Sequence, residues 1–429
     1  MGNCGTLINR RDFRLTGIYL KKAYKGLIIS PKFELIAIAI IVLLASAVRV
    51  RVAWPALSGE QGFVIGDDDD YYRLAIAFLE RGTLEDSGQM AFRMPFFPLT
   101  LSSIYYVFGK VPHYAHPFII ALGVLTCIVV YIIGKEVFDP PIGFVAGLLA
   151  SIDINLAFYS KFLLTETLFV FLVILSMLSL ERLRRFQTWQ WAIISGGFLG
   201  LAVLTRVNFG IFVFIIAAWI LYYGRSRIIT ATRNVLIMGI MVGGLWSAWI
   251  GRNFLELGSF IPFTTQSGNA YYPVYHDVSS NRSDLVYYGY WLDIPLPDDL
   301  KASDEVGRDK ELRLIASNWI RDHRNEAIKI ALTQPFHFWQ PEVTGDLSYL
   351  LLALAGIVGF IWSTKDKKPS VFLWGLFAIG STFLTIPSIG LPRFRVVLHP
   401  LIAILAAFAF VTSGRRIFRN RFSTTSLLR

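Results

Sequence analysis

The sequence predicts an all-α protein that crosses a membrane about ten times, and three observations support this. Hydrophobic residues make up 54% of the 429 residues and charged residues only 17%, below the roughly 25% of average soluble domains. The apolar residues gather in runs of about 16 to 20, long enough to cross a bilayer. Short segments rich in Lys and Arg separate these runs, as in cytoplasmic loops. The net charge of +11 is therefore a topology signal and does not indicate nucleic-acid binding.

The predicted spans follow a basic N-terminal segment, residues 1–32. The first span covers residues 33–52, and the others cover 116–134, 141–158, 162–180, 189–204, 207–223, 235–250, 347–362, 371–386 and 396–411. Because basic residues concentrate on the cytoplasmic side of a membrane, we expect both termini in the cytoplasm and the protein in the cell (inner or plasma) membrane.

A further apolar stretch, residues 94–108, is predicted not to span. About 15 helical residues cover only about 22 Å, less than the roughly 30 Å hydrocarbon core, and the stretch contains Pro95 and Pro98. Counting it as a span would place the basic loops outside, so we expect an interfacial or re-entrant helix on the outer side. The chain then divides into a cytoplasmic segment 1–32, a membrane core 33–250 that includes an outer loop 51–115, an outer loop 251–346, C-terminal membrane helices 347–412 and a cytoplasmic tail 413–429.

The first outer loop contains four consecutive acids, Asp67 to Asp70, directly before a helical pattern. Carboxylates at a helix N-terminus cap free N–H groups and are favoured by the helix dipole. Four acids exceed what one cap requires, so a general base, a metal site or both are alternatives. Arg93 follows at the start of the 94–108 stretch, where an arginine either reaches to the membrane interface or clamps a phosphate or carboxylate.

These motifs resemble the GT-C superfamily of lipid-linked-sugar glycosyltransferases. The order is an acid pair with Tyr-x-x-Leu-Ala, then Arg-x-Pro-x-x-Pro-x-Leu from Arg93. It is similar to the family 39/83-like branch, which includes protein O-mannosyltransferases and the aminoarabinose transferase of lipid A. Asp67 falls on the first catalytic acid of this branch and Asp68 on the position after it, and the four-Asp run leaves open which of the two is the base. Further elements of the resemblance contain Glu166, Arg206, Arg252, Asn269, Tyr271, Arg393 and Arg395.

The resemblance implies inverting transfer of a sugar from a polyprenyl-phosphate donor to an acceptor hydroxyl on the outer side, in glycosylation of a cell-envelope lipid, glycan or protein. Asp67 would act as base, with Asp68 or Glu166 positioning the acceptor or a cation. The arginines that would bind the donor phosphate are Arg93, Arg206, Arg252, Arg393 and Arg395. Tyr71, Asn269 and Tyr271 would contact the acceptor or support the site. The resemblance leaves metal dependence open; a divalent ion, if used, would be held by Asp67 and Glu166.

A transporter or flippase is the alternative, because it too would be polytopic with charges inside the membrane. Against it, the helices show no clear inverted repeat, and the acids cluster in a loop instead of at the midplane. The sequence does not identify the sugar, the acceptor, the prenyl chain or the oligomeric state.

Two patterns predict packing. In the second outer loop, apolar residues recur at the spacing of an amphipathic helix, which we expect to pack on the bilayer or on the first outer loop. They are Leu312, Ile315, Ala316, Trp319 and Ile320. Three glycine pairs at four-residue spacing predict close helix contacts. They are Gly143 with Gly147, Gly196 with Gly200, and Gly239 with Gly243.

Overall fold

The computed structural model describes residues 31–60, 66–276, 296–301, 303–341, 346–387 and 389–424. These residues form helices joined by short turns, with a single isolated β-bridge between Asp86 and Gln89. Nearly all of the predicted N-terminal segment 1–32, and residues 425–429 of the predicted tail, lie outside the described residues. The all-α class predicted from the sequence is confirmed for the part that is described.

Every predicted span contains a helix. They are α2 (Pro31–Leu57), α5 (His116–Val137), α6 (Pro140–Ile152) with α7 (Ile154–Phe158), α8 (Thr165–Phe186), α9 (Trp189–Thr205), α10 (Gly210–Tyr223), α11 (Ile228–Leu257), α19 (Leu347–Thr364), α20 (Pro369–Phe383) and α21 (His399–Thr424). Within the described residues, five helices are long and apolar enough to cross a membrane, or six if the bent pair at α6 and α7 is one span. The protein is therefore a multi-pass membrane protein, while the number ten stays a prediction.

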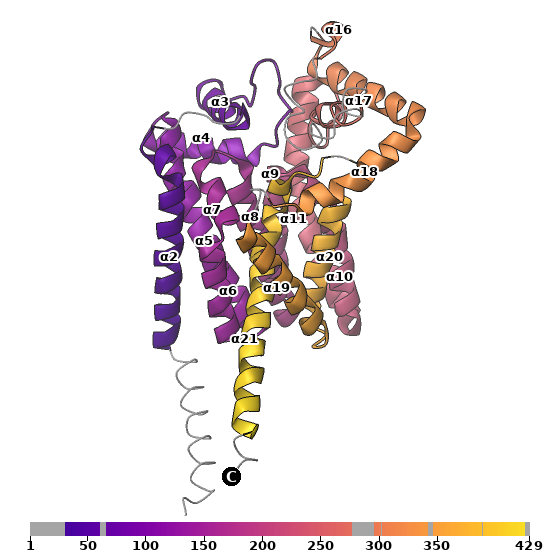
Figure 1. Cartoon of the computed structure of the whole chain (residues 1–429). Coiled ribbons are helices and arrows are strands. Elements are labelled where there is room, and N and C mark those ends of the chain that lie inside the picture. The colour runs from indigo at the N-terminus through magenta and orange to yellow at the C-terminus, as the bar shows by residue number, and fades with distance from the viewer. Residues whose placement is uncertain are drawn as a thin grey trace, which may run out of the picture.

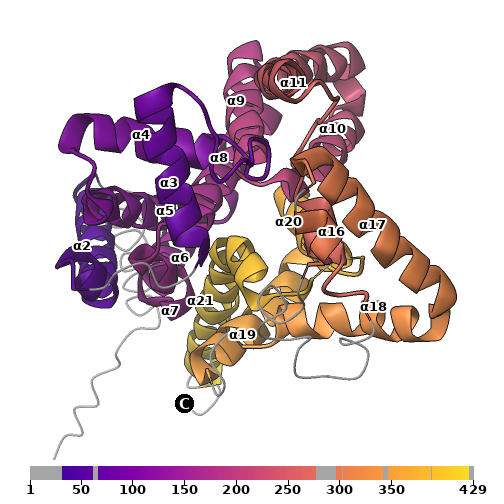
Figure 2. The same ribbon diagram turned by 90° about the horizontal axis from the view of Figure 1, so that it is seen from above.

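The long helices run side by side, and the helices of the two loops predicted to lie outside cover one end of this bundle (Figure 1). These covering helices are α3 (Gly66–Arg81), α4 (Phe96–Phe108), α12 (Ser267–Tyr271), α16 (Asp298–Lys301), α17 (Glu305–Asp322) and α18 (Arg324–Trp339). Helix α2 begins and α21 ends at the opposite end of the bundle. Seen from above, α4 lies across the bundle end (Figure 2), as expected of a helix that does not span. The acid run and the second outer loop are thereby brought to the same end.

Two of the three glycine pairs lie at helix contacts. A Cβ at Gly143 in α6 would meet the carbonyl oxygen of Tyr131 in α5 at 2.5 Å, and one at Gly196 in α9 would meet backbone atoms of α11. Only glycine allows these backbones to approach so closely. Gly239 and Gly243 in α11 have no atom within 4 Å of such a Cβ, so the prediction for this third pair is wrong.

Helix α17 is the amphipathic helix predicted in the second outer loop. Its N-terminus is capped by Asp304, whose carboxylate accepts a hydrogen bond from the Gly307 N–H at 2.8 Å. Of the five residues predicted for its apolar face, Leu312, Ala316 and Trp319 are buried and Ile315 is half-buried. Ile320 is exposed, so the prediction is wrong for this residue. The helix packs against α12, which belongs to the same loop.

Candidate active site

Asp67 lies in the first turn of α3, where the sequence predicts a helix N-terminus, and is held between two arginines. Its Oδ1 accepts a hydrogen bond from Arg93 Nη2 at 2.6 Å and its Oδ2 one from Arg393 Nη1 at 3.0 Å. Burial raises the pKa of the Asp67 carboxyl, but the positive charges and hydrogen bonds of the two arginines outweigh it, so the pKa lies below its ordinary value. Asp67 is therefore ionised at neutral pH and can accept a proton.

Glu166, in the first turn of α8, lies on the other side of Arg393. Its side chain is buried, and its Oε1 accepts a hydrogen bond from Arg206 Nη1 at 3.2 Å. Arg393 Nε is 3.9 Å from the same oxygen. The Oε2 atom is buried without a hydrogen-bond partner. The two acids thus share Arg393, which stands in η5 (Pro392–Leu398), so segments far apart in the sequence meet at this point.

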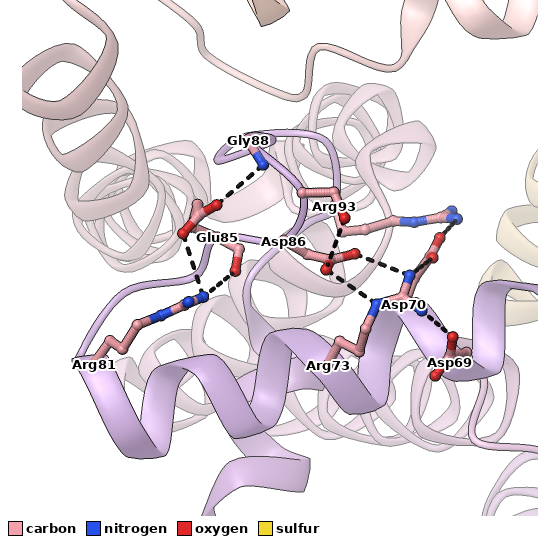
Figure 3. Close-up of polar contacts among 9 residues, drawn as sticks. Asp69, Asp70, Arg73, Arg81, Glu85, Asp86, Gly88 and Arg93 are labelled. Carbon is pink, nitrogen blue, oxygen red and sulfur yellow. Dashed lines mark hydrogen bonds and ion pairs between the residues drawn. The ribbon is translucent and has the colours of Figure 1, made fainter.

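Asp69 and Asp70 of the run belong to a second ion-pair group around Arg73 (Figure 3). The Arg73 guanidinium bonds to Asp69, to Asp70 at 2.8 Å and to Asp86 at 3.0 Å. Asp70 also accepts a hydrogen bond from Arg93 Nη2 at 2.7 Å and so links the two groups. Asp68 is buried directly beside them in the chain. The run is thus more than a helix cap, because Asp67, Asp69 and Asp70 each pair with an arginine.

After α3, a tight hairpin turn brings the chain back toward the N-terminal end of that helix. Asp86 and Gln89 exchange two backbone hydrogen bonds, of 3.0 and 2.8 Å, and the two residues between them have positive φ angles. These are Ser87 at 51° and Gly88 at 78°, the conformation of a type I′ hairpin turn, which favours Gly. Figure 3 shows this loop folded back over α3, with Asp86 and Arg93 facing the acid run.

Tyr71 packs against Arg93. The ring is buried, packs edge-to-face on Phe97 with 5.1 Å between ring centres, and lies 5.3 Å from Arg93 Cζ. Burial raises the pKa of the Tyr71 hydroxyl. The contact to the guanidinium is a cation–π interaction, so the structure places Tyr71 within the predicted site as a packing partner of Arg93.

An aromatic pocket adjoins Arg206. The Arg206 guanidinium lies 4.9 Å from the Phe394 ring centre and 5.7 Å from that of Phe169. The empty space in this pocket, counted together with the open space at its mouth, is about 520 Å³. It is lined by Phe169, Arg206, Asn208, Phe209, Phe212, Phe338, Phe377, Ser381, Leu384, Thr385, Ile389, Phe394 and Val397. Sequence reasoning missed this pocket because its residues come from segments far apart in the chain, among them α8, α18, α20 and η5, and only the packing of these segments brings them together.

Four other predicted site residues take no part in the ion pairs described above. They are Arg252, Arg395, Asn269 and Tyr271. Arg252 donates hydrogen bonds to the carbonyl oxygens of Met90 at 2.7 Å and Leu84 at 3.2 Å. Arg395 is fully buried and donates to the carbonyl oxygens of residues 338 and 340 at 2.8 and 2.5 Å. Asn269 and Tyr271 lie on α12, which packs on α17.

The structure also bears on the predicted cation. Among the described residues, no group of three or more His, Cys, Asp and Glu side chains is arranged to hold a metal ion. Asp67 and Glu166 supply two carboxylates, and Arg393 occupies the position between them. A divalent ion bound by this pair would have to displace the Arg393 side chain, since both oxygens already face its positive charge.

Comparisons with known proteins show which solved folds the chain is similar to. The profile of the dolichyl-phosphate-mannose-protein mannosyltransferase family matches residues 93–249, less than half of the chain. The oligosaccharyltransferase AglB from Archaeoglobus fulgidus, in complex with an inhibitory peptide and a dolichol-phosphate, is 14% identical with a TM-score of 0.57, over 92% of this chain and 52% of that chain. The same enzyme tethered to an acceptor peptide gives 14% identity and a TM-score of 0.59, over 91% and 51%.

The chain thus spans about half the length of these solved relatives. ArnT from Cupriavidus metallidurans, bound to undecaprenyl phosphate, is 13% identical with a TM-score of 0.42, over 89% of this chain and 78% of that chain. No curated protein matches the sequence. The chain has the GT-C fold, and the resemblance predicted from its motifs is confirmed at this level.

Proposed function

We propose that the protein is a membrane glycosyltransferase, which transfers a sugar from a polyprenyl-phosphate donor to an acceptor hydroxyl at the end of the bundle covered by α3. One observation carries this proposal: two acids, Asp67 and Glu166, share Arg393 beside an aromatic pocket with Arg206 at its edge. A base, cations for a phosphate and an apolar surface for a prenyl chain are the three things this reaction needs. The GT-C fold, and the dolichol-phosphate in the AglB complex, support the proposal.

Asp67 supplies the base. In the proposed step the acceptor oxygen forms a bond to the anomeric carbon of the donor sugar while the bond from that carbon to the phosphate oxygen breaks. The proton of the hydroxyl passes to the Asp67 carboxylate, and the bond electrons leave with the prenyl phosphate. Attack opposite to the leaving group inverts the configuration of the anomeric carbon. The low pKa of Asp67 keeps it ionised, which this role requires.

Arginines stabilise the charge that develops on the leaving phosphate. Arg206 and Arg393 both reach Glu166, and Arg93 reaches Asp67, so the three guanidinium groups surround the acids. Their geometry favours them over Arg252 and Arg395, which donate to backbone carbonyls. The prenyl chain would occupy the aromatic pocket beside Arg206. Because Arg393 lies between Asp67 and Glu166, the charge stabilisation is assigned to these arginines and not to a divalent ion.

The test is to incubate the purified, detergent-solubilised protein with a panel of polyprenyl-phosphate sugars and to measure release of the free prenyl phosphate. We expect release with at least one donor. Repeating the assay with a chelator shows whether a metal ion takes part. A second assay uses the protein reconstituted into lipid vesicles. Movement of the intact lipid across the vesicle membrane, with no release from any donor in the first assay, would support the transporter alternative and refute the proposal.

A further inference from the structure

The loop that carries Arg93 is held by side chains of the second outer loop and the helix before it. Arg252 in α11 donates to the carbonyl oxygens of Leu84 and Met90, at 3.2 and 2.7 Å. Glu305 in α17 binds backbone N–H groups of the same loop. Its carboxylate accepts hydrogen bonds from the Met90 N–H at 2.7 Å and the Ala91 N–H at 3.0 Å. Arg252 therefore binds carbonyl groups of the loop, and Glu305 binds its N–H groups.

Thr265 completes this arrangement. Its hydroxyl donates to Glu305 Oε1, and its backbone N–H donates to the Ala91 carbonyl oxygen at 3.0 Å. Glu305 and Thr265 are both buried, and Ala91 is fully buried between them. Hydrogen bonds to an ionised group are the stronger ones, and their loss in a buried place leaves the backbone amides unsatisfied. We call Arg252, Thr265 and Glu305 the loop clasp.

The clasp ends two residues before Arg93, the arginine that contacts Asp67. Only Phe92 separates Ala91 from Arg93, and Arg93 Nη2 contacts both Asp67 and Asp70. We propose that Glu305 is a positioning residue: by binding the Met90 and Ala91 amides it fixes Arg93 against Asp67, so that the second outer loop sets the geometry of the reaction centre. The positioning part of this inference rests on the function proposed above, whereas the clasp itself does not.

The charges around Asp67 give this role a specific readout. Arg93 faces Asp67 from the clasped loop, Arg393 from η5, and Glu166 lies beyond Arg393 in α8. Asp70 and Tyr71 face the same region from α3 itself. If Arg93 moves away while Arg393 stays, Asp67 loses one of the two charges that lower its pKa. The acid limb of the pH–rate profile then moves to higher pH, because the base is protonated at a pH where it is ionised in the parent.

The experiment compares Glu305→Gln with Glu311→Gln in the full-length, purified protein. Glu311 is exposed on the same helix, so its substitution makes the same chemical change without touching the loop. A glutamine at position 305 offers one acceptor oxygen in place of two. We expect faster amide hydrogen exchange in peptides covering residues 84–94, a fall of about tenfold in the rate of prenyl-phosphate release, and an acid limb at higher pH. Glu311→Gln should match the parent in all three.

Two outcomes would overturn the inference. Unchanged exchange in residues 84–94 would show that Glu305 does not hold the loop. Faster exchange with a parental rate and pH profile would show that the clasp does not position Arg93. If the parent protein releases prenyl phosphate from no donor, the proposed function fails, but the exchange measurement still decides whether the clasp exists.

A milder pair of variants covers the case in which Glu305→Gln does not fold. Thr265→Val removes only the hydroxyl that binds Glu305, whereas Thr265→Ser retains it. We expect the same changes in exchange and pH profile for the valine variant, smaller in size, and their rescue in the serine variant. Equal behaviour of the two would contradict the inference.

Discussion

Asp67→Asn separates a catalytic carboxylate from a structural one, because the two substituents have nearly the same shape and Asn caps a helix about as well as Asp. Loss of a general base costs about a hundredfold to ten-thousandfold in rate, or about 3 to 5 kcal/mol in activation free energy. The structural cost is smaller. Arg93 keeps its hydrogen bond to Asp70 and Arg393 stays within 3.9 Å of Glu166, so neither cation is left alone.

Asn keeps one acceptor oxygen and so loses one of the two hydrogen bonds that Asp67 accepts from Arg93 and Arg393. We therefore expect the free energy of unfolding of Asp67→Asn to fall by no more than about 3 kcal/mol, the upper value for one hydrogen bond to a charged group. The assay is the initial rate of prenyl-phosphate release at saturating donor, with thermal unfolding measured on the same preparations. Asp69→Asn is the matched control, since Asp69 lies in the same turn and pairs with Arg73 at the surface. It should retain the parental rate.

A parental rate for Asp67→Asn would refute the reasoning that Asp67 is the base. Asp68→Asn is measured in parallel, because the acid run leaves two adjacent candidates. Loss of transfer in that variant alone would move the base to Asp68. A loss of rate that follows a loss of thermal stability in every variant would instead favour a capping role for the whole run.

Three other predictions test the donor site, the helix packing and the topology. Arg206→Lys should raise the KM for the lipid donor at least severalfold, since a lysine cannot form the paired hydrogen bonds of a guanidinium with phosphate; an unchanged KM would remove Arg206 from the donor site. Gly359→Ala should destabilise the protein by about 1 to 3 kcal/mol in thermal unfolding, because its Cβ would collide with the backbone of α21, whereas Gly251→Ala, with open space around it, should not; equal stability of both would contradict this packing. Single cysteines at Lys110 and Lys367, in a background without the native cysteines, should react with a membrane-impermeant thiol reagent from opposite sides, and labelling of both from the same side would disprove the ten-span topology.

The sequence by itself determined the elements and their class. Runs of apolar residues are local, so they predict where the membrane helices lie, and the short proline-containing stretch 94–108 predicts a helix that lies across the bundle end, as α4 does. The position of the acid run at a helix N-terminus and the amphipathic pattern of α17 are equally local; the first is confirmed, and the second is confirmed except at Ile320. The family motifs showed which charged residues along the chain are candidates for the site.

Only the tertiary structure decided which of these charges meet. Arg393 is 326 residues from Asp67 in sequence and 3.0 Å away in space. Arg252 and Arg395 look the same as Arg393 in a motif, but their guanidinium groups bind backbone carbonyls. Glu305 looks like an ordinary acid at the start of a helix, yet it binds the loop that carries Arg93. Local periodicity determines which face of a helix is apolar, whereas the partner of a buried charge depends on how separate helices pack, and that is a property of the whole fold.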